Sequence, residues 1–352
     1  MDLYPLARPF MSLIDPETAH RLTIRALRMG LGPRQKQPDP VSLAIDLFGL
    51  HFENPLGIAA GFDKNGEVPD AILAMGMGFA EVGTVTPRPQ AGNPRPRVFR
   101  LPLHRAVINR LGFNNEGHEA LKKRLIARRS RRGIVGVNIG ANKDSADRIA
   151  DYEAGIRAFD GLASYFTVNI SSPNTPGLRA LQNKEELETL IVRVLAARHT
   201  GTARMTPVLL KIAPDLGAEE LADIADVALR LGLDGIIVSN TTIVREGLVS
   251  GVNADETGGL SGAPLFAMST RVLADIYRLT QGRIPLVGVG GISSGDDAYG
   301  KIRAGASLLQ LYSALTYDGP ALVGRIKADL AAQLAADGFA NLKDAVGADV
   351  KL

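Results

Sequence analysis

Short apolar runs alternate with longer amphipathic stretches from residue 55 onward. Eight of these runs are apolar almost throughout, which is typical of parallel strands buried on both faces. They are PLGIAAG (55–61), GFAEVGTV (78–85), GIVGVNIG (133–140), SYFTVNI (164–170), PVLLKIA (207–213), DGIIVSN (234–240), IPLVGVGG (284–291) and SLLQLYS (307–313). Helical patterns fill the gaps, for example at 183–199 and 217–232.

Eight strand–helix repeats predict a single α/β domain built as a (β/α)8 TIM barrel. A doubly wound parallel sheet is the alternative. The number of runs favours the barrel, as do the polar residues that collect where the runs end. These ends carry Asp63, Lys64, Thr84, Asn138, Asn169, Lys211, Ser239 to Thr242, Gly290, Gly291, Tyr312 and Ser313. Barrel enzymes place their chemistry at the carboxyl ends of the strands, so we expect a site there.

Two features of these ends indicate an anionic ligand. The segment GVGGISSGDDA (288–298) places paired glycines before Ser293, Ser294 and Gly295, which open a helix. Backbone N–H groups at such a turn bind phosphate. Lys64 and Lys211 lie at buried strand ends, where a cation is costly unless it meets an anion. A salt bridge to Asp63 would explain Lys64 alone, but two such lysines favour an anionic cofactor and substrate.

The first 40 residues form a separate unit, followed by a catalytic domain at 41–352. DPETAHRLTIRALRMG (15–30) predicts a helix with Asp15 as its N-cap, Pro16 in its first turn and Gly30 at its end. Arg21, Arg25 and Arg28 form one stripe of it. The unit is interpreted as a helical cap on the barrel, or as an amphipathic module on an anionic membrane surface. Residues 42–55 alternate as in a β-hairpin that closes the amino end of the barrel.

Composition narrows the possible chemistry. The chain has no cysteine, which excludes disulfides, a protein-ligated iron–sulfur cluster and a cysteine base. Its five histidines lack metal-ligand spacing, so no metal is expected. No apolar run is long enough to cross a membrane, and the N-terminus does not resemble a signal peptide. Net charge is +3, and the basic cluster at 122–132 reads as a solvated helix end.

Nine blocks together resemble the dihydroorotate dehydrogenases. They are NPLGIAAGFDKNGE, EVGTVTPRPQAGNPRPR, INRLGFNN, VNISSPNTPGLR, KIAPD, SNTT, TGGLSG, GVGGI and LYSAL, in the order of that family and over nearly all of residues 50–320. The resemblance implies a barrel that binds FMN and oxidises (S)-dihydroorotate to orotate in pyrimidine biosynthesis. A related FMN barrel reductase that uses fumarate, or NAD through a partner, is the alternative within the same chemistry.

The resemblance also assigns residues to the cofactor and the substrate. The implied FMN contacts are Ala60, Gly61, Phe62, Asp63, Lys64, Thr84, Asn138, Asn169, Lys211, Ser239, Gly262, Gly291, Tyr312 and Ser313. The implied substrate contacts are Lys64, Asn109, Arg110, Leu111, Gly112, Phe113, Asn169, Asn174, Asn240 and Thr241. Many relatives carry Thr at the position of Ser239, and the hydroxyl is retained here.

The family divides according to whether a cysteine or a serine takes the substrate proton. The matching residue is Ser172, and Thr175 is a candidate to relay its proton. Pro173, Pro176 and Gly177 suit a lid. The serine class carries an N-terminal extension that attaches to the membrane and admits quinone. The 40-residue unit fits that extension, with His20 and Arg28 as quinone-site candidates.

These features together lead us to expect a monomer on the cytoplasmic face of the inner membrane, with a membrane quinone as electron acceptor. We expect no nucleic-acid partner. A non-catalytic barrel that binds RNA or phosphate through its basic residues is the alternative from a different class of function.

Overall fold

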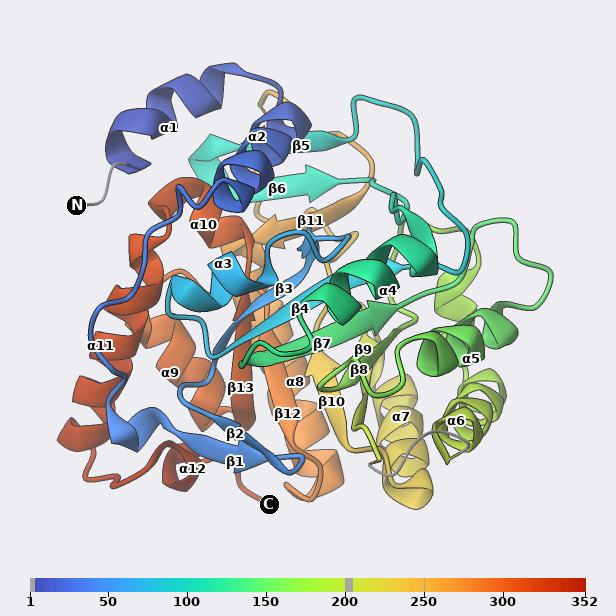
Figure 1. The fold of residues 1–352 in the computed structure, drawn as a ribbon. Coiled ribbons are helices and arrows are strands. Elements are labelled where there is room, and N and C mark those ends of the chain that lie inside the picture. Colours follow the sequence, from blue (N-terminus) through green and yellow to red (C-terminus); the bar gives the residue numbers. More distant parts are fainter. Residues whose placement is uncertain (1–3, 200–204, 250) are drawn as a thin grey trace.

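The computed structural model describes residues 4–199, 205–249 and 251–352. Within them the eight predicted runs form one closed parallel barrel (Figure 1). Its strands are β3 (Leu56–Asp63), β4 (Phe79–Val85), β7 (Ile134–Ile139), β8 (Phe166–Asn169), β9 (Val208–Ile212), β10 (Gly235–Val238), β12 (Leu286–Val289) and β13 (Ala306–Leu311). They pair in that order, and β13 closes onto β3. The barrel is therefore confirmed and the doubly wound alternative is wrong.

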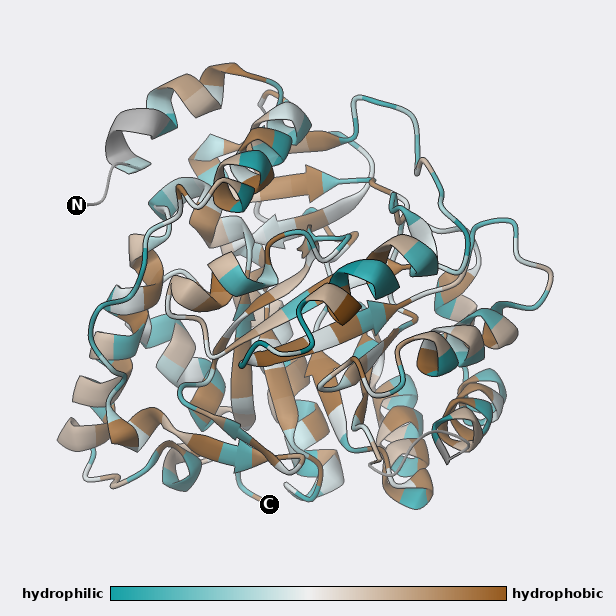
Figure 2. Ribbon diagram, viewed as in Figure 1, coloured by the Kyte–Doolittle hydropathy of each residue, from teal (hydrophilic) through white to brown (hydrophobic). Residues whose placement is uncertain are grey.

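Helices follow the barrel strands and surround them. They are α3 (Pro69–Ala74), α4 (Gly117–Ala127), α5 (Arg148–Ala158), α6 (Lys184–His199), α7 (Ala218–Leu231), α8 (Phe266–Thr280), α9 (Gly295–Arg303) and α11 (Ala321–Ala336). Two shorter helices are α10 (Ser313–Asp318) and α12 (Leu342–Ala345). In Figure 2 the strands are largely brown, while the helices carry teal and brown residues together. This pattern matches the sequence, because strands covered by helices are buried on both faces.

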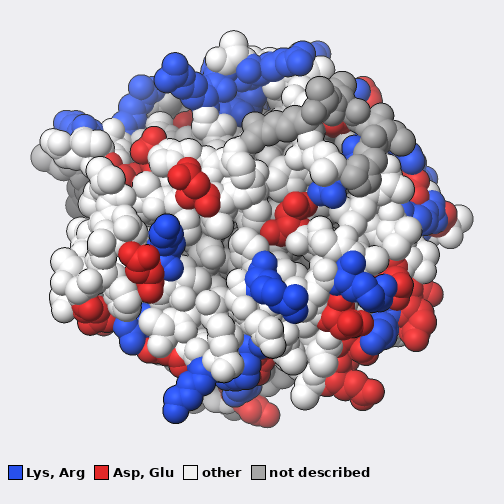
Figure 3. Space-filling model, turned by 90° about the horizontal axis from the view of Figure 1, so that it is seen from below, with Lys and Arg blue, Asp and Glu red and all other residues white. Residues whose placement is uncertain are grey.

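The predicted hairpin is present as β1 (Ile45–Leu47) and β2 (Leu50–Phe52) at the amino end of the barrel. The Phe52 ring packs edge-on against Phe79 at the start of β4, with ring centroids 5.5 Å apart. Phe48, in the turn, reaches the first residue of β10, since a Cβ on Gly235 would lie 3.2 Å from its ring. Figure 3 views this end of the molecule, where acidic and basic side chains are interspersed and basic ones gather along one edge.

Three of the seven basic side chains at 122–132, near the end of α4, are paired with carboxylates. Arg124 binds Glu116 at 2.6 Å. Arg128 and Arg131 both bind Asp70, at 3.0 and 2.8 Å. The predicted solvated helix end is thus present, and these ion pairs neutralise part of its charge.

The N-terminal unit folds as two helices, α1 (Tyr4–Leu13) and α2 (Pro16–Arg28), above the carboxyl end of the barrel (Figure 1). Residues 1–3 of the predicted unit lie outside the described residues. Asp15 caps α2 as predicted, because its carboxylate accepts a hydrogen bond from the Thr18 N–H at 2.8 Å. Ile24 and Leu27 are buried on one face of α2. No helix in the described chain is long and apolar enough to cross a membrane.

A three-stranded antiparallel sheet, which the sequence patterns did not predict, lies between the barrel and α2. Its strands are β5 (Val98–Leu101), β6 (Ala106–Asn109) and β11 (Gly259–Gly262), in the order β11-β6-β5. Phe99, Ile108 and Leu260 form part of its small core, separate from that of the barrel. The sheet places Asn109, at the end of β6, above the carboxyl ends of the barrel strands.

Candidate functional site

One cavity of about 850 Å³ joins the carboxyl ends of the barrel strands to the N-terminal helices. Most of the predicted site residues line it. They are His20, Ala60, Gly61, Phe62, Lys64, Thr84, Asn109, Leu111, Gly112, Phe113, Asn169, Ser172, Asn174, Lys211, Ser239, Asn240, Thr241, Gly262, Gly291, Tyr312 and Ser313. Residues from many separate segments therefore meet around one space, as expected at the top of a barrel.

Five predicted residues do not line this cavity. Asp63 is buried and accepts hydrogen bonds from the N–H groups of Glu67 and Val68, both at 2.8 Å, so its carboxylate holds the loop before α3. Arg28 is exposed and pairs with Glu67 at 2.9 Å. Arg110 pairs with Glu256 at 2.6 Å. Asn138 and Thr175 are buried behind the cavity wall.

The two predicted lysines extend into the inner end of the cavity. Lys64 donates to the Gly61 carbonyl at 2.8 Å, and no ion pair joins it to Asp63. Burial lowers the pKa of Lys64 to about 8. Burial likewise lowers the pKa of Lys211, while the nearby charge of Glu81 opposes that shift. Among the described residues, no hydrogen-bond or ion-pair partner of the Lys211 ammonium is found within the protein, which suits an anionic ligand.

A chain of amide and hydroxyl groups forms the floor of the inner end. Thr84 donates to Asn138 Oδ1 at 2.6 Å, and Asn169 Nδ2 donates to the Thr84 hydroxyl at 2.9 Å. Asn138 in turn donates to Glu81 at 2.8 Å. Glu81 is fully buried and also accepts from Gln310 at 2.7 Å. The buried carboxylate thus anchors side chains whose neighbours line the cavity.

A second part of the wall combines glycine turns with hydroxyl groups. Gly291 and Ser293 precede α9, where Ser294 is the N-cap and accepts from the Asp297 N–H at 3.0 Å. Ser313 also lines the cavity, and its hydroxyl donates to the Ser261 hydroxyl at 2.8 Å. The sequence patterns pointed to the neighbouring Gly262 but not to Ser261. The position of Ser261 next to Gly262 was the one sequence feature that could have identified it as a site residue. Such a turn and helix start can bind a phosphate.

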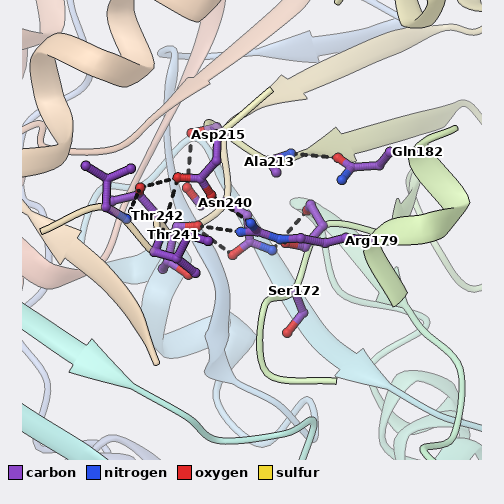
Figure 4. A network of polar contacts seen from close by, with 12 residues as sticks. Ser172, Arg179, Gln182, Ala213, Asp215, Asn240, Thr241 and Thr242 are labelled. Atoms are coloured by element: carbon purple, nitrogen blue, oxygen red, sulfur yellow. Dashed lines mark hydrogen bonds and ion pairs between the residues drawn. The ribbon is translucent and has the colours of Figure 1, made fainter. Parts of the chain in front are cut away.

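The loop after β8 carries the predicted base. Ser172 is 6% exposed, and its oxygen accepts from the Asn174 N–H at 3.3 Å. Asn174 Nδ2 reaches the Asn109 carbonyl at 3.1 Å, which ties the loop to the antiparallel sheet. Figure 4 shows Ser172 beside a polar network that joins this loop to the loops after β9 and β10. Thr175, the candidate relay, is 4% exposed and belongs to the same loop.

Three rings join the N-terminal unit to the barrel. His20 packs edge-on against Phe62, with centroids 5.4 Å apart, and Phe62 packs edge-on against Tyr312 at 5.5 Å. The Tyr312 hydroxyl lies 3.4 Å from His20 Nδ1. Burial lowers the pKa of His20 to about 3, and the charge of Lys64 adds to the effect. His20 is therefore neutral at physiological pH.

The outer end of the cavity includes charged residues that the sequence patterns missed. Glu17 lies on α2 and receives two hydrogen bonds from Arg97, at 2.7 and 2.9 Å. Arg100 on β5 also lines the cavity and donates to the Ile14 carbonyl at 2.9 Å. Nothing in its local sequence distinguishes Arg100 from other surface arginines. Its position becomes evident only once the antiparallel sheet is known.

Across the residues that the structure describes, no group of three His, Cys, Asp or Glu side chains could hold a metal ion. The titratable groups that do line the cavity are lysines, a histidine, arginines, tyrosines and one paired glutamate. The arrangement suits binding of a planar anionic ligand, with a hydroxyl group as the proton acceptor.

Known proteins provide independent comparisons. Residues 42–334 match the family described as dihydroorotate dehydrogenase. A protein of Parvibaculum lavamentivorans named dihydroorotate dehydrogenase (quinone) is 84% identical over 352 residues, covering all of both chains. The protein of that name from Rhodospirillum rubrum is 58% identical, covering 99% of this chain and 95% of its own. A crystal structure of DHODH from Eimeria tenella in complex with ferulenol has a TM-score of 0.93 at 41% identity, covering 96% of each chain.

Proposed function

The chain belongs to the dihydroorotate dehydrogenase family, and from this membership we propose how its cavity carries out the reaction. The chain oxidises dihydroorotate to orotate in pyrimidine biosynthesis, with a quinone as electron acceptor. The single observation that carries the proposal is the cavity itself. It connects the strand-end residues to the N-terminal helices without a break.

FMN is the cofactor that fits the inner end. Gly61 has a φ of +100° and leaves open space, since the nearest atom to a Cβ there would be a Tyr312 carbon at 3.8 Å. Within the described chain, neither the Lys211 ammonium nor the buried Gln310 Oε1 has a hydrogen-bond partner, although the Glu81 charge acts on Lys211 from nearby. Gly262, Gly291 and Ser313 would hold the phosphate and ribityl groups. When bound, FMN supplies the hydride acceptor and passes the electrons to quinone.

Dihydroorotate oxidation removes a hydride from one ring carbon and a proton from its neighbour. Ser172 takes that proton, and its own hydroxyl proton leaves through Thr175, directly or through a water. The Asn174 N–H stabilises the negative charge that develops on the Ser172 oxygen. Lys64, Asn109, Asn174, Asn240 and Thr241 hold the carboxylate and amide groups of the substrate. The buried loop keeps water away, which a weak base such as serine requires.

Quinone would enter at the outer end, beside His20. The N-terminal unit exposes large apolar side chains, among them Phe10, Leu13 and Leu31 at 74%, 85% and 71% exposure. Apolar groups beside exposed arginines suit peripheral attachment to an anionic membrane surface. We place the protein as a monomer on the cytoplasmic face of the inner membrane.

The decisive experiment compares electron acceptors. Enzyme reconstituted with FMN is supplied with dihydroorotate and with ubiquinone, menaquinone, fumarate or NAD in parallel. A quinone should support turnover far better than fumarate or NAD. Equal or faster turnover with fumarate or NAD would overturn the assignment of the acceptor. A protein that remains colourless after exposure to FMN would overturn the cofactor.

A further inference from the structure

One arginine side chain joins three of the loops that build the inner end of the cavity. Arg179 Nε donates to the Ser171 carbonyl at 3.1 Å, after β8. Its Nη1 donates to Asp215 at 2.8 Å, after β9, and its Nη2 donates to the Thr241 carbonyl at 3.2 Å, after β10. Figure 4 shows the guanidinium group between the Asp215 and Thr241 side and the loop that carries Ser172.

Asp215 is itself fixed, so the arginine is held against a rigid partner. One of its oxygens binds Arg179, and the other accepts from the Thr242 hydroxyl and from the Ile243 N–H at 3.3 Å. The side chains of Arg179 and Asp215 are only 24% and 12% exposed. A partly buried, charge-assisted pair of this kind is stronger than a surface ion pair.

The contact with Ser171 bears directly on the proposed base. The Ser171 carbonyl belongs to the peptide unit that leads into Ser172, and a peptide unit is planar. Holding that carbonyl therefore sets the direction in which the Ser172 backbone leaves. Asn240 reinforces the same point, because its Nδ2 donates to the Ser171 hydroxyl at 3.0 Å.

The contact with Thr241 holds the loop that is expected to bind the substrate. Thr241 lines the cavity and belongs to the loop expected to hold the substrate. One planar guanidinium thus sets the position of the base-bearing loop relative to the substrate-bearing loop. Lysine cannot reproduce this, because its ammonium is a point charge without the fixed fork of donors.

We propose that Arg179, held by Asp215, is a positioning residue for proton transfer, and that it orients the Ser172 hydroxyl toward the substrate. This inference rests on the proposed role of Ser172. Arg179 does not line the cavity, and its guanidinium acts through the backbone of residues 171 and 241.

The test uses the full-length holoenzyme and stopped-flow reduction of the flavin by dihydroorotate. Arg179→Lys should lower the limiting rate of flavin reduction by about 10- to 100-fold, because a misplacement on the order of 1 Å has that effect. Flavin content and reoxidation by quinone should stay within about twofold of wild type on the same geometric argument. Asp215→Asn, which keeps the side-chain size, should shift the same step in the same direction.

An isotope effect separates positioning from general loss of structure. Deuterium on the substrate carbon that loses the proton should slow the variant more than it slows wild type, because proton transfer becomes more rate-limiting. The matched control is Arg148→Lys. Arg148 also binds this loop, at the Pro176 carbonyl at 2.7 Å, but from the exposed side away from Ser171. The Arg148→Lys substitution should leave both the rate of flavin reduction and the isotope effect near their wild-type values.

Provided that the wild-type enzyme reduces its flavin with dihydroorotate, two results would overturn the inference. One is an Arg179→Lys enzyme that reduces its flavin at the wild-type rate. The other is equal loss of flavin reduction and quinone reoxidation with an unchanged isotope effect, in both Arg179→Lys and Asp215→Asn. If wild type itself fails to reduce its flavin with dihydroorotate, the proposed function fails instead.

Discussion

The inner end of the cavity is walled by polar side chains from many barrel strands, whereas its outer end is walled by one helical unit and a small sheet. At the inner end Lys64, Asn169 and Lys211 come from three distant segments, and each is held by the barrel backbone. At the outer end Leu22 and Ala26 come from a single turn of α2. Proton transfer demands fixed polar groups, whereas a hydrophobic electron acceptor demands an apolar entrance.

This contrast predicts that the two half-reactions can be damaged separately. The largest effect should come from Ser172→Ala, which removes the proposed base at the inner end. Flavin reduction by dihydroorotate should slow by roughly 10²- to 10⁴-fold, the usual contribution of a positioned base. FMN and orotate should still bind, and quinone should still reoxidise the reduced enzyme. Stopped-flow spectroscopy of each half-reaction measures this, and near-normal flavin reduction would refute the assignment.

Removal of residues 1–40 would take away the helical wall at the outer end of the cavity. Quinone reduction should fall by roughly tenfold or more, because the acceptor loses the walls that orient it. Reduction of the flavin by dihydroorotate should change much less. Stopped-flow rates for each half-reaction, measured on FMN-loaded enzyme, provide the comparison. Equal loss of both half-reactions would mean that the unit only supports the barrel.

The truncation also removes Glu17 and leaves Arg97 without its carboxylate, so a point variant is needed. Glu17→Gln should lower the free energy of unfolding by about 3 kcal/mol, because it leaves a buried charge uncompensated. Burial alone would raise the pKa of Glu17, but Arg97 and Arg95 outweigh it and lower that pKa below 4.5. The stabilisation is thus complete above pH 4.5 and is lost as the pH falls below that value. Chemical denaturation at pH 7 and pH 4 measures both effects, and equal stability of variant and wild type at pH 7 would contradict them.

The smallest effect concerns His20. Its pKa is about 3 in the folded protein and about 6.5 in the unfolded chain. Only the unfolded chain gains a proton as the pH falls from 6.5, so stability declines below pH 6.5, by about 2 kcal/mol at pH 5. His20→Gln should abolish that part of the decline. Denaturation curves at pH 7 and pH 5 measure it, and the same pH dependence in both proteins would show that His20 does not cause it.

How far the sequence predicts this structure differs between the same two regions. The eight barrel strands could be recognised because each is apolar almost throughout. The antiparallel sheet could not, because its strands have four residues each and lie among glycines, prolines and charges. Asn109 was expected to bind substrate, but the sheet that presents it was not. β5 and β6 pair locally, but β11 joins them from a distant part of the chain, and the propensity of such short strands depends on these neighbours.

The roles of charged residues were the hardest to read. Asp63 was expected beside the cofactor, yet its oxygens accept backbone N–H groups instead. Glu81 was not singled out in the sequence, yet its buried carboxylate anchors the floor through Asn138 and Gln310. Arg179 is the last residue of the motif VNISSPNTPGLR, but the sequence indicated no role for it. Its contacts at residues 171, 215 and 241 depend on the three-dimensional arrangement and leave no local pattern.

The ion pair between Glu17 and Arg97 has a consequence for how the two ends communicate. Arg97 also donates to the Asn93 carbonyl at 2.7 Å, and the Asn93 side chain donates to the Asn174 carbonyl at 3.2 Å. A continuous series of polar contacts therefore runs from α2 to the loop that carries the proposed base. A ligand that binds beside α2 and shifts these contacting residues would change the affinity of the site for orotate by some factor. Orotate must then change the affinity for that ligand by the same factor, because thermodynamic linkage is reciprocal.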